Sequence, residues 1–166
     1  TQAEAAAIAE DLNVTTRALV MSNSFATKGR AAVDRFRAKG VRAGLLRLRV
    51  LRPFPAAAVA NALRGRKAVG VIDQNMSIGF GGITYGEVTS AMYAERAGPP
   101  ILSFIGALGG KDISELEFDR ILEDLEASSA SGETPPLRLL YTRADEAQMN
   151  GFLRLAGKVR GEEIRT

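Results

Sequence analysis

Residues 68–86 read AVGVIDQNMSIGFGGITYG and carry the strongest structural signal in this chain. The apolar run 68–72 predicts a buried strand, and the polar, glycine-rich run from Asp73 to Gly82 predicts a long loop before a helix that starts near Tyr85. In an open parallel sheet, the loops at the carboxyl ends of the strands face the ligands. We therefore expect the contacts of this domain to lie on this loop and its neighbours.

Four further apolar runs flank this one and alternate with helical patterns. Such alternation is typical of repeated βα units and predicts an α/β fold, a three-layer sandwich with a mainly parallel five-stranded sheet. The five expected strands cover residues 17–21, 41–51, 68–72, 100–105 and 137–142.

The expected helices are identified by their apolar stripes and end signals. Phe25, Gly29, Val33 and Phe36 form one stripe of a helix that closes at Lys39-Gly40. Three more helices follow: one from Pro55 through Leu63, one near residues 85–96, and one that begins at the capping box Ser114-Glu115-Leu116-Glu117. Phe118, Ile121, Leu122 and Leu125 are the predicted buried face of the last.

The two ends of the chain are expected to differ from the middle. Residues 1–16 predict an alanine-rich helix or a frayed segment, and residues 17–166 predict a single α/β domain. Residues 127–136 predict a flexible connection. Residues 144–160 predict a helix that docks on the sheet through Met149, Phe152, Leu153, Leu155 and Ala156. Because the first residue is Thr, we expect the chain to be a fragment of a longer protein.

Composition excludes several classes of function. The chain has 166 residues, 46% of them hydrophobic, and a net charge of +3. Its apolar runs are shorter than the ~20 residues of a membrane span, and its basic residues are mostly interleaved with acids, so neither a membrane nor a nucleic acid is an expected partner. The chain contains neither Cys nor His. Disulfides, thiolate-held clusters and histidine-based acid–base chemistry are therefore excluded from it.

Three loops follow the carboxyl ends of the predicted strands: 22–24, 73–82 and 106–112. An anion can bind where such a loop meets the first turn of a helix. The glycines at 79, 81 and 82, however, do not make the dinucleotide-binding pattern, and no P-loop pattern is present. We therefore favour turn and close-packing roles that let a neighbouring domain or subunit lie against the sheet edge. Asp73, Glu87 and Asp112 are interpreted as helix-capping or ion-pairing groups, with no acid–base pair among them.

Three motifs in order resemble the carboxy-terminal domain, or domain II, of the α subunit of pyruvate:ferredoxin oxidoreductase, a family with a transketolase C-terminal-like fold. The corresponding residues are Arg52, Pro53, Phe54 and Pro55, then Asp73, Asn75, Ser77, Gly79 and Gly82, then Gly106, Gly109, Gly110 and Asp112. By this resemblance they shape the domain and its interfaces, and none is expected to be catalytic or to bind a cofactor or metal. The chain departs from the family at Ser22-Asn23, Gln74 and Lys111.

The resemblance implies a structural and assembly domain of a cytoplasmic, thiamine-diphosphate-dependent enzyme. The parent complex would convert a 2-oxo acid and coenzyme A to acyl-CoA, carbon dioxide and reduced ferredoxin. Its thiamine diphosphate, Mg²⁺ and iron–sulfur clusters would lie outside this chain, which by itself would be inactive. The implied partners are the amino-terminal thiamine-binding domain of the same subunit, the β subunit, the iron–sulfur subunits or domains, and ferredoxin.

Two alternatives stay open from the residues. One is a stand-alone α/β module that binds an anion or a nucleotide at the helix amino termini. The other is the related C-terminal domain of a transketolase-like enzyme. The 2-oxo acid and the oligomeric state are not specified by this sequence.

Overall fold

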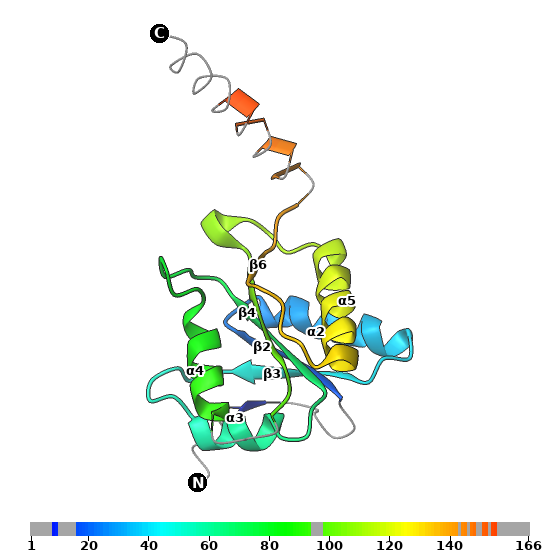
Figure 1. Cartoon of the computed structure of the whole chain (residues 1–166), viewed down its shortest axis with the longest axis vertical. Helices are drawn as coiled ribbons and strands as arrows, with labels where there is room; N and C mark the ends of the chain where they lie inside the picture. Colours follow the sequence, from blue (N-terminus) through cyan, green and yellow to red (C-terminus); the bar gives the residue numbers. More distant parts are fainter. Residues whose placement is uncertain are drawn as a thin grey trace.

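A sheet between two pairs of helices forms the body of the molecule (Figure 1). The computed structural model describes residues 8–9, 16–93, 98–142, 144–145, 147–148, 151–152 and 154–155. None of the helices in these ranges combines the length and apolar character needed to cross a bilayer.

Six strands form one sheet in the order β1-β3-β2-β4-β5-β6. The predicted five-stranded parallel sheet is confirmed in β3-β2-β4-β5-β6, and the two-residue strand β1 pairs antiparallel with the outer edge of β3. The strand bounds are β1 Ile8–Ala9, β2 Arg17–Ser22, β3 Ala43–Leu48, β4 Ala68–Asp73, β5 Ile101–Ile105 and β6 Arg138–Leu139.

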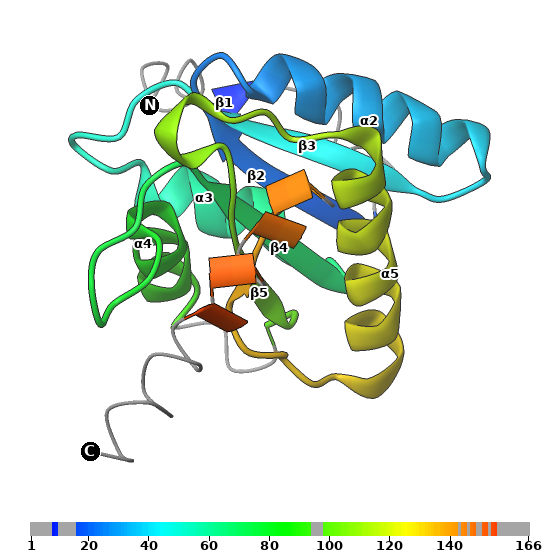
Figure 2. The same ribbon diagram turned by 90° about the horizontal axis from the view of Figure 1, so that it is seen from above.

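The helices cover both faces of the sheet, which gives the predicted three layers (Figure 2). Helices α2 and α5 pack on one face, and α3 and α4 pack on the other. Their bounds are α2 Ala26–Ala38, α3 Ala56–Leu63, α4 Ile83–Met92 and α5 Glu115–Ser131, with a 3₁₀ turn η1 at Leu108–Gly110.

Both faces of the central strand β4 are buried, which explains its continuous apolar sequence. On the α2 and α5 side, Phe36, Phe104 and Leu125 belong to one apolar cluster. On the α3 and α4 side, Leu63 and Val71 belong to a second. The two clusters fix the sheet between its helices and hold the loops at its carboxyl edge in place.

The connection through α5 has the opposite hand from the other three. The chain moves from β2 to β3 in one direction through α2, and from β5 to β6 in the other direction through α5, yet both helices lie on the same face. The connections through α3 and α4 move across the sheet in the direction opposite to the α2 connection, and their helices lie on the opposite face from α2. These two reversals cancel, so the α3 and α4 connections have the same hand as the α2 connection. Because about 98% of such crossovers are right-handed, the side on which α5 lies is not predictable from sequence alone.

The two ends of the chain differ from the sequence-based expectation where they are described. Ile8 and Ala9 form the strand β1, whereas a helix or frayed end was expected there; the rest of 1–15 lies outside the described residues. The described residues between 144 and 155 include helical ones, as predicted. The predicted docking on the sheet is wrong for Phe152 and Leu155, which are 61% and 59% exposed. Met149, Leu153 and Ala156 lie outside the described residues.

The predicted capping box at the start of α5 is confirmed. Ser114 is the N-cap, and the buried Glu117 side chain accepts a hydrogen bond from the Ser114 amide.

We expect Ser114→Ala to lower the free energy of unfolding by about 0.5–2 kcal/mol, because an amide of the first turn loses its acceptor. Urea denaturation at pH 7 measures this. Ser129→Ala, the same change inside α5, should stay within about 0.5 kcal/mol, and equal losses for both variants would contradict a capping role.

Candidate functional site

The loops that follow the parallel strands meet at the carboxyl edge of the sheet. Because β3, β2, β4 and β5 run in the same direction, the loops 23–25, 49–55, 74–82 and 106–114 all leave from this edge. The loops after β3 and β4 lie on the left in Figures 1 and 2. The three motifs singled out from the sequence fall on these loops and the ends of their strands.

Asp73 ends β4 and caps helix α4. The residue is 1% exposed, and its two carboxylate oxygens accept hydrogen bonds from the amides of Thr84 and Tyr85, each at 3.0 Å. Asn75 adds a third contact, since its side-chain oxygen accepts from the Ile83 amide at 3.1 Å. Together the two side chains satisfy the first three amides of α4, which Gly82 at the N-cap position cannot do without a side chain. The capping role predicted for Asp73 is confirmed.

Gly82 is required by the close approach of Asp73. A Cβ atom built on Gly82 would lie 2.1 Å from Oδ2 and 2.5 Å from Cγ of Asp73. Real Cβ contacts are not that short, so any side chain here displaces the carboxylate from the helix amides. Gly82 is thus a close-packing residue of the kind that the sequence suggested.

The segment 77–81 is a closed turn at the tip of this loop. The Ser77 amide donates to the Gly81 carbonyl at 2.8 Å, and the Gly81 amide donates back to the Ser77 carbonyl at 3.0 Å. Gly79 and Gly81 have φ of +78° and +91°, values that residues with a side chain rarely adopt. The Phe80 ring lies against the backbone of Gly86, where a Cβ would meet it at 2.7 Å. The turn is therefore fixed to α4 by Phe80 as well as by Asp73 and Asn75.

Apolar side chains are exposed on the turn and on the neighbouring loop. Ile78 is 98% exposed and Phe80 is 68% exposed, while Met76, Val50 and Leu51 are each at least two-fifths exposed. Sequence reasoning did not single out these residues. The available signal was the presence of Met, Ile and Phe in a glycine-rich loop, where polar residues are usual.

The motif after β3 positions the loop beside α4. The sequence predicted a helix that starts at Pro55, and in the structure Pro55 is the N-cap residue of α3, one position before its first helical residue. Phe54 packs against the apolar cluster of α3 and α4. Arg52 forms a salt bridge of 2.8 Å with Glu87 of α4. The peptide bond before Pro53 is cis. This loop is therefore tied to the same helix as the turn 77–81.

The motif after β5, residues 106–112, lies on the other side of β4 from the loop after β3. The Gly106 amide donates to the Asp73 carbonyl at 3.0 Å, and a Cβ on Gly106 would lie 3.0 Å from Leu140. Gly109 and Gly110 face open space. Asp112 forms an ion pair with Lys28 of α2, and Lys111 forms one with Asp145. The structure thus brings Gly106 next to Asp73 and turns Asp112 away from it, toward α2.

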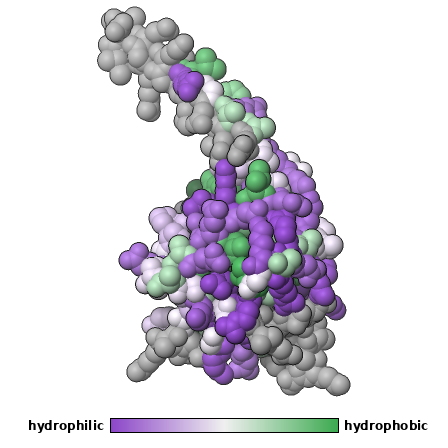
Figure 3. Space-filling view, turned by 90° about the vertical axis from the view of Figure 1, so that its right-hand side faces the viewer, coloured by the Kyte–Doolittle hydropathy of each residue, from purple (hydrophilic) through white to green (hydrophobic). Residues whose placement is uncertain are grey.

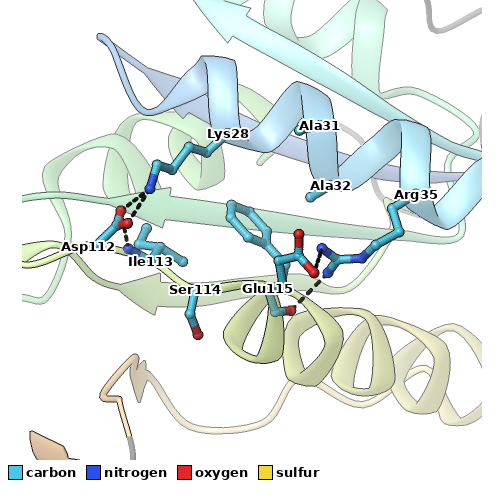
Figure 4. A pocket seen from close by; sticks show the side chains of 9 residues that line it. Lys28, Ala31, Ala32, Arg35, Asp112, Ile113, Ser114 and Glu115 are labelled. Atoms are coloured by element: carbon cyan, nitrogen blue, oxygen red, sulfur yellow. Dashed lines mark hydrogen bonds and ion pairs between the residues drawn. The ribbon is translucent and has the colours of Figure 1, made fainter.

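An open groove of about 600 Å³ separates α2 from the start of α5 (Figure 4). Its charged side chains face one another across the groove: Lys28 pairs with Asp112, and Arg35 pairs with Glu115 and Asp119. Figure 3 shows the α5 side of the molecule as mainly hydrophilic, with small, separate apolar areas. Because these ion pairs join α2 to α5 and to the loop before it, we assign the groove a structural role.

The carboxylates of these ion pairs have shifted pKa values. The hydrogen bond from Lys28, followed by that from the Ile113 amide, lowers the pKa of Asp112. Burial alone would raise the pKa of Asp119, but hydrogen bonds from Lys39 and Arg35 outweigh it, and the pKa is lowered. Asp124 behaves in the opposite way, since burial raises its pKa and the nearby charge of Arg138, 2.8 Å away, offsets only part of this.

The stability of the chain should depend on pH through these groups. A folded-state pKa below the usual 3.8 means that Asp119 stabilises the fold above about that pH and loses this contribution as the pH falls through the folded value. Asp124 stabilises the fold below about pH 3.8 and loses this stabilisation as the pH rises through its raised folded-state pKa. We expect Asp119→Asn to flatten the rise of unfolding free energy between about pH 2 and pH 6, and Asp124→Asn to steepen it. Urea denaturation across this range measures both slopes, and slope changes of the same sign would contradict the assignment.

Among the described residues, no group of three or more carboxylates is placed to hold a metal ion. With Cys and His absent from the sequence, the chain also lacks the thiolate and imidazole ligands of iron–sulfur clusters. The described residues therefore do not fit a metal ion, and the sequence does not fit an iron–sulfur cluster held by thiolate or imidazole.

Comparison with known proteins gives one family. The family model for pyruvate:ferredoxin oxidoreductase core domain II matches residues 16–118. Among curated proteins, the pyruvate synthase subunit PorA of Methanothermobacter thermautotrophicus is 37% identical over 108 residues, which cover 65% of this chain and 27% of that protein. The ketoisovalerate oxidoreductase subunit VorA of Pyrococcus furiosus is 32% identical over 61% of this chain and 26% of its own length.

A third relative extends the match. The NADH-dependent phenylglyoxylate dehydrogenase subunit alpha of Aromatoleum evansii is 34% identical over 127 residues, which cover 74% of this chain and 30% of that protein. The chain thus spans between a quarter and a third of the length of these relatives.

Proposed function

We propose that this chain, which belongs to the pyruvate:ferredoxin oxidoreductase core domain II family, serves as the non-catalytic assembly domain of the α-type subunit of a 2-oxoacid:ferredoxin oxidoreductase. The parent enzyme would use thiamine diphosphate to convert a 2-oxo acid and coenzyme A to acyl-CoA and carbon dioxide, with reduction of ferredoxin. Pyruvate is the first substrate to test, because several of the matched relatives carry pyruvate in their names.

The family match over residues 16–118 carries this proposal. The names of the relatives contain pyruvate, ketoisovalerate and phenylglyoxylate, at similar identities of 37%, 32% and 34%. These three compounds are 2-oxo acids with very different side chains. A domain that all three proteins share at similar identity is better suited to a role common to them, such as assembly, than to selecting the substrate.

The geometry of the carboxyl edge supports an assembly role. Both oxygens of Asp73 accept helix amides, and Asp112 is held by Lys28, so these carboxylates are engaged in holding elements together. The edge also exposes the apolar side chains of Val50, Leu51, Met76, Ile78 and Phe80, which suit contact with protein better than acid–base chemistry. We propose that the partners are the amino-terminal thiamine-binding domain of the same subunit, the β subunit and the iron–sulfur subunits. The cofactors would be held by those parts.

The test is an assay of the full-length gene product purified with its partner subunits. We expect pyruvate-dependent and coenzyme A-dependent reduction of ferredoxin or a viologen dye by the complex, and none by the 166-residue chain. A complex that oxidises no 2-oxo acid would refute the parent activity. Turnover by the 166-residue chain alone would refute the non-catalytic role. Calorimetry of this chain against thiamine diphosphate, coenzyme A and nucleotides adds a separate check, since micromolar binding would favour a stand-alone binding module.

A further inference from the structure

The turn 77–81 holds the apolar side chain of Ile78 in solvent, although a loop that faces only water has no need of an apolar residue there. Ile78 is 98% exposed at the tip, with Met76 and Phe80 on either side of it. Burying one such side chain at a protein interface strengthens the binding equilibrium by roughly 10- to 100-fold. Single exposed apolar residues are ordinary, but here three alternate along one short segment.

The backbone of the turn is held in one conformation. Paired hydrogen bonds between Ser77 and Gly81 close it, and Phe80 lies against Gly86 of α4. At its base, Asp73 and Asn75 bind the first amides of α4. A side chain on such a support loses little backbone entropy when it binds, which favours its use as an anchor.

The chemistry of the turn favours a protein pocket over other partners. Residues 74–86 contain no Asp, Glu, Lys or Arg. A membrane-binding segment normally carries basic residues for the lipid headgroups, and a nucleic-acid contact needs them for phosphates. The core of a protein interface is instead depleted in charge and enriched in aromatic residues and Met.

We propose that Ile78 is an anchor residue that inserts into an apolar pocket of its own full-length polypeptide, in the part outside this chain. The occupant follows from length: the segments that match this chain cover only 26–30% of the relatives, so more than half of such a polypeptide lies outside the 166 residues. This inference rests on the proposed function, because it takes the chain to be one domain of such a subunit.

The direct test places the photo-cross-linker p-benzoylphenylalanine at position 78 of the full-length protein, purified with its partner subunits. We expect cross-links to residues of the same polypeptide outside the 166-residue segment, located by mass spectrometry. The same cross-linker at Leu116, which is 55% exposed on α5, is the matched control and should give at least tenfold fewer. Cross-links from position 78 to a partner subunit, to the turn of a second copy or to lipid, or no cross-links at all, would overturn the proposal.

A substitution gives an independent measurement. In the full-length protein, Ile78→Asp should speed amide hydrogen exchange of residues 77–81 by about 10- to 100-fold, because the docked state is lost. In the 166-residue chain the same change should leave the urea midpoint and the exchange rates unaltered, since Ile78 is already in solvent. Leu116→Asp should alter neither. Equal exchange rates at the turn in wild-type and Ile78→Asp full-length protein would overturn the proposal.

These readouts separate the two proposals. A complex that oxidises a 2-oxo acid but gives no cross-links from position 78 retains the proposed function and loses the anchor. A protein that cross-links as expected but oxidises no 2-oxo acid retains the anchor and loses the proposed parent activity.

Discussion

Replacing Gly82 by Ala is expected to lower the free energy of unfolding by about 2–4 kcal/mol, from overpacking of about 1–3 kcal/mol and a lost helix cap of about 0.5–2 kcal/mol. The reason is the added Cβ atom, which would lie 2.1 Å from Oδ2 of Asp73. Gly82 has φ of −77° and ψ of 139°, which Ala adopts without strain. The collision with Asp73 is therefore the cause of the expected loss, and backbone conformation is not. Urea denaturation at pH 7 measures it.

A matched glycine shows the size of the effect without the collision. Gly151 is helical, and nothing lies within 4 Å of a Cβ built on it. Gly151→Ala should leave stability unchanged or raise it by up to about 1 kcal/mol, because Ala favours the helix. In the double variant with Asp73→Ala, the cost of Gly82→Ala should shrink. Strictly additive costs would contradict the steric explanation, since they would mean that residues 73 and 82 do not interact.

The contact between Gly82 and Asp73 also determines how docking at this edge is tested. A bulky residue at position 82 would displace the carboxylate of Asp73 and loosen α4. Loss of binding to a partner protein in such a variant would therefore not show that position 82 contacts that partner. Ile78 avoids this difficulty because its side chain is exposed in the chain itself. A variant at position 78 changes the surface and leaves the cap intact.

The sheet and the helices were predictable from this sequence because their signals are local. Apolar runs such as 68–72 mark the buried strands, and the Ser114 to Glu117 capping box marks the start of α5. By contrast, Ile8–Ala9 is too short for a periodic pattern, and its strand depends on pairing with the edge of β3. Its alanine-rich surroundings favoured a helix, and pairing in the sheet prevailed over that preference.

The candidate site was predictable in position and only partly in detail. The carboxyl-edge rule located the loops, and a carboxylate at the end of a strand suggested a helix cap. The partners of Asp73 lie 11 and 12 residues further along the chain, and only the folded loop brings them to it. The exposure of Ile78 likewise depends on the closed turn. A composition-based reading assigns Ile to the core, because most Ile side chains are buried.

Asp73→Asn is expected to destabilise the chain by about 2–4 kcal/mol. The Asn amide replaces one accepting oxygen by a donor that faces a helix N–H. This removes a charge-assisted hydrogen bond worth about 1.5–3 kcal/mol and the favourable charge at the helix amino terminus, worth about 0.3–2 kcal/mol. Urea denaturation of the 166-residue chain measures the loss. Asp112→Asn is the matched control, because Asp112 forms a solvent-exposed pair with Lys28 and its loss should cost much less than the loss of Asp73.

In the proposed 2-oxo acid oxidoreductase complex, the same variant separates a structural carboxylate from a catalytic one. A general acid or base typically contributes about 10²- to 10⁴-fold to the rate. Because both oxygens of Asp73 already accept backbone amides, we expect Asp73→Asn to change kcat/KM for the 2-oxo acid by less than about twofold per assembled complex, with a lower yield of complex. The measurement requires the concentration of intact complex, determined by size-exclusion chromatography with light scattering. A loss of 100-fold or more in fully assembled complex would mean that this carboxylate takes part in the reaction.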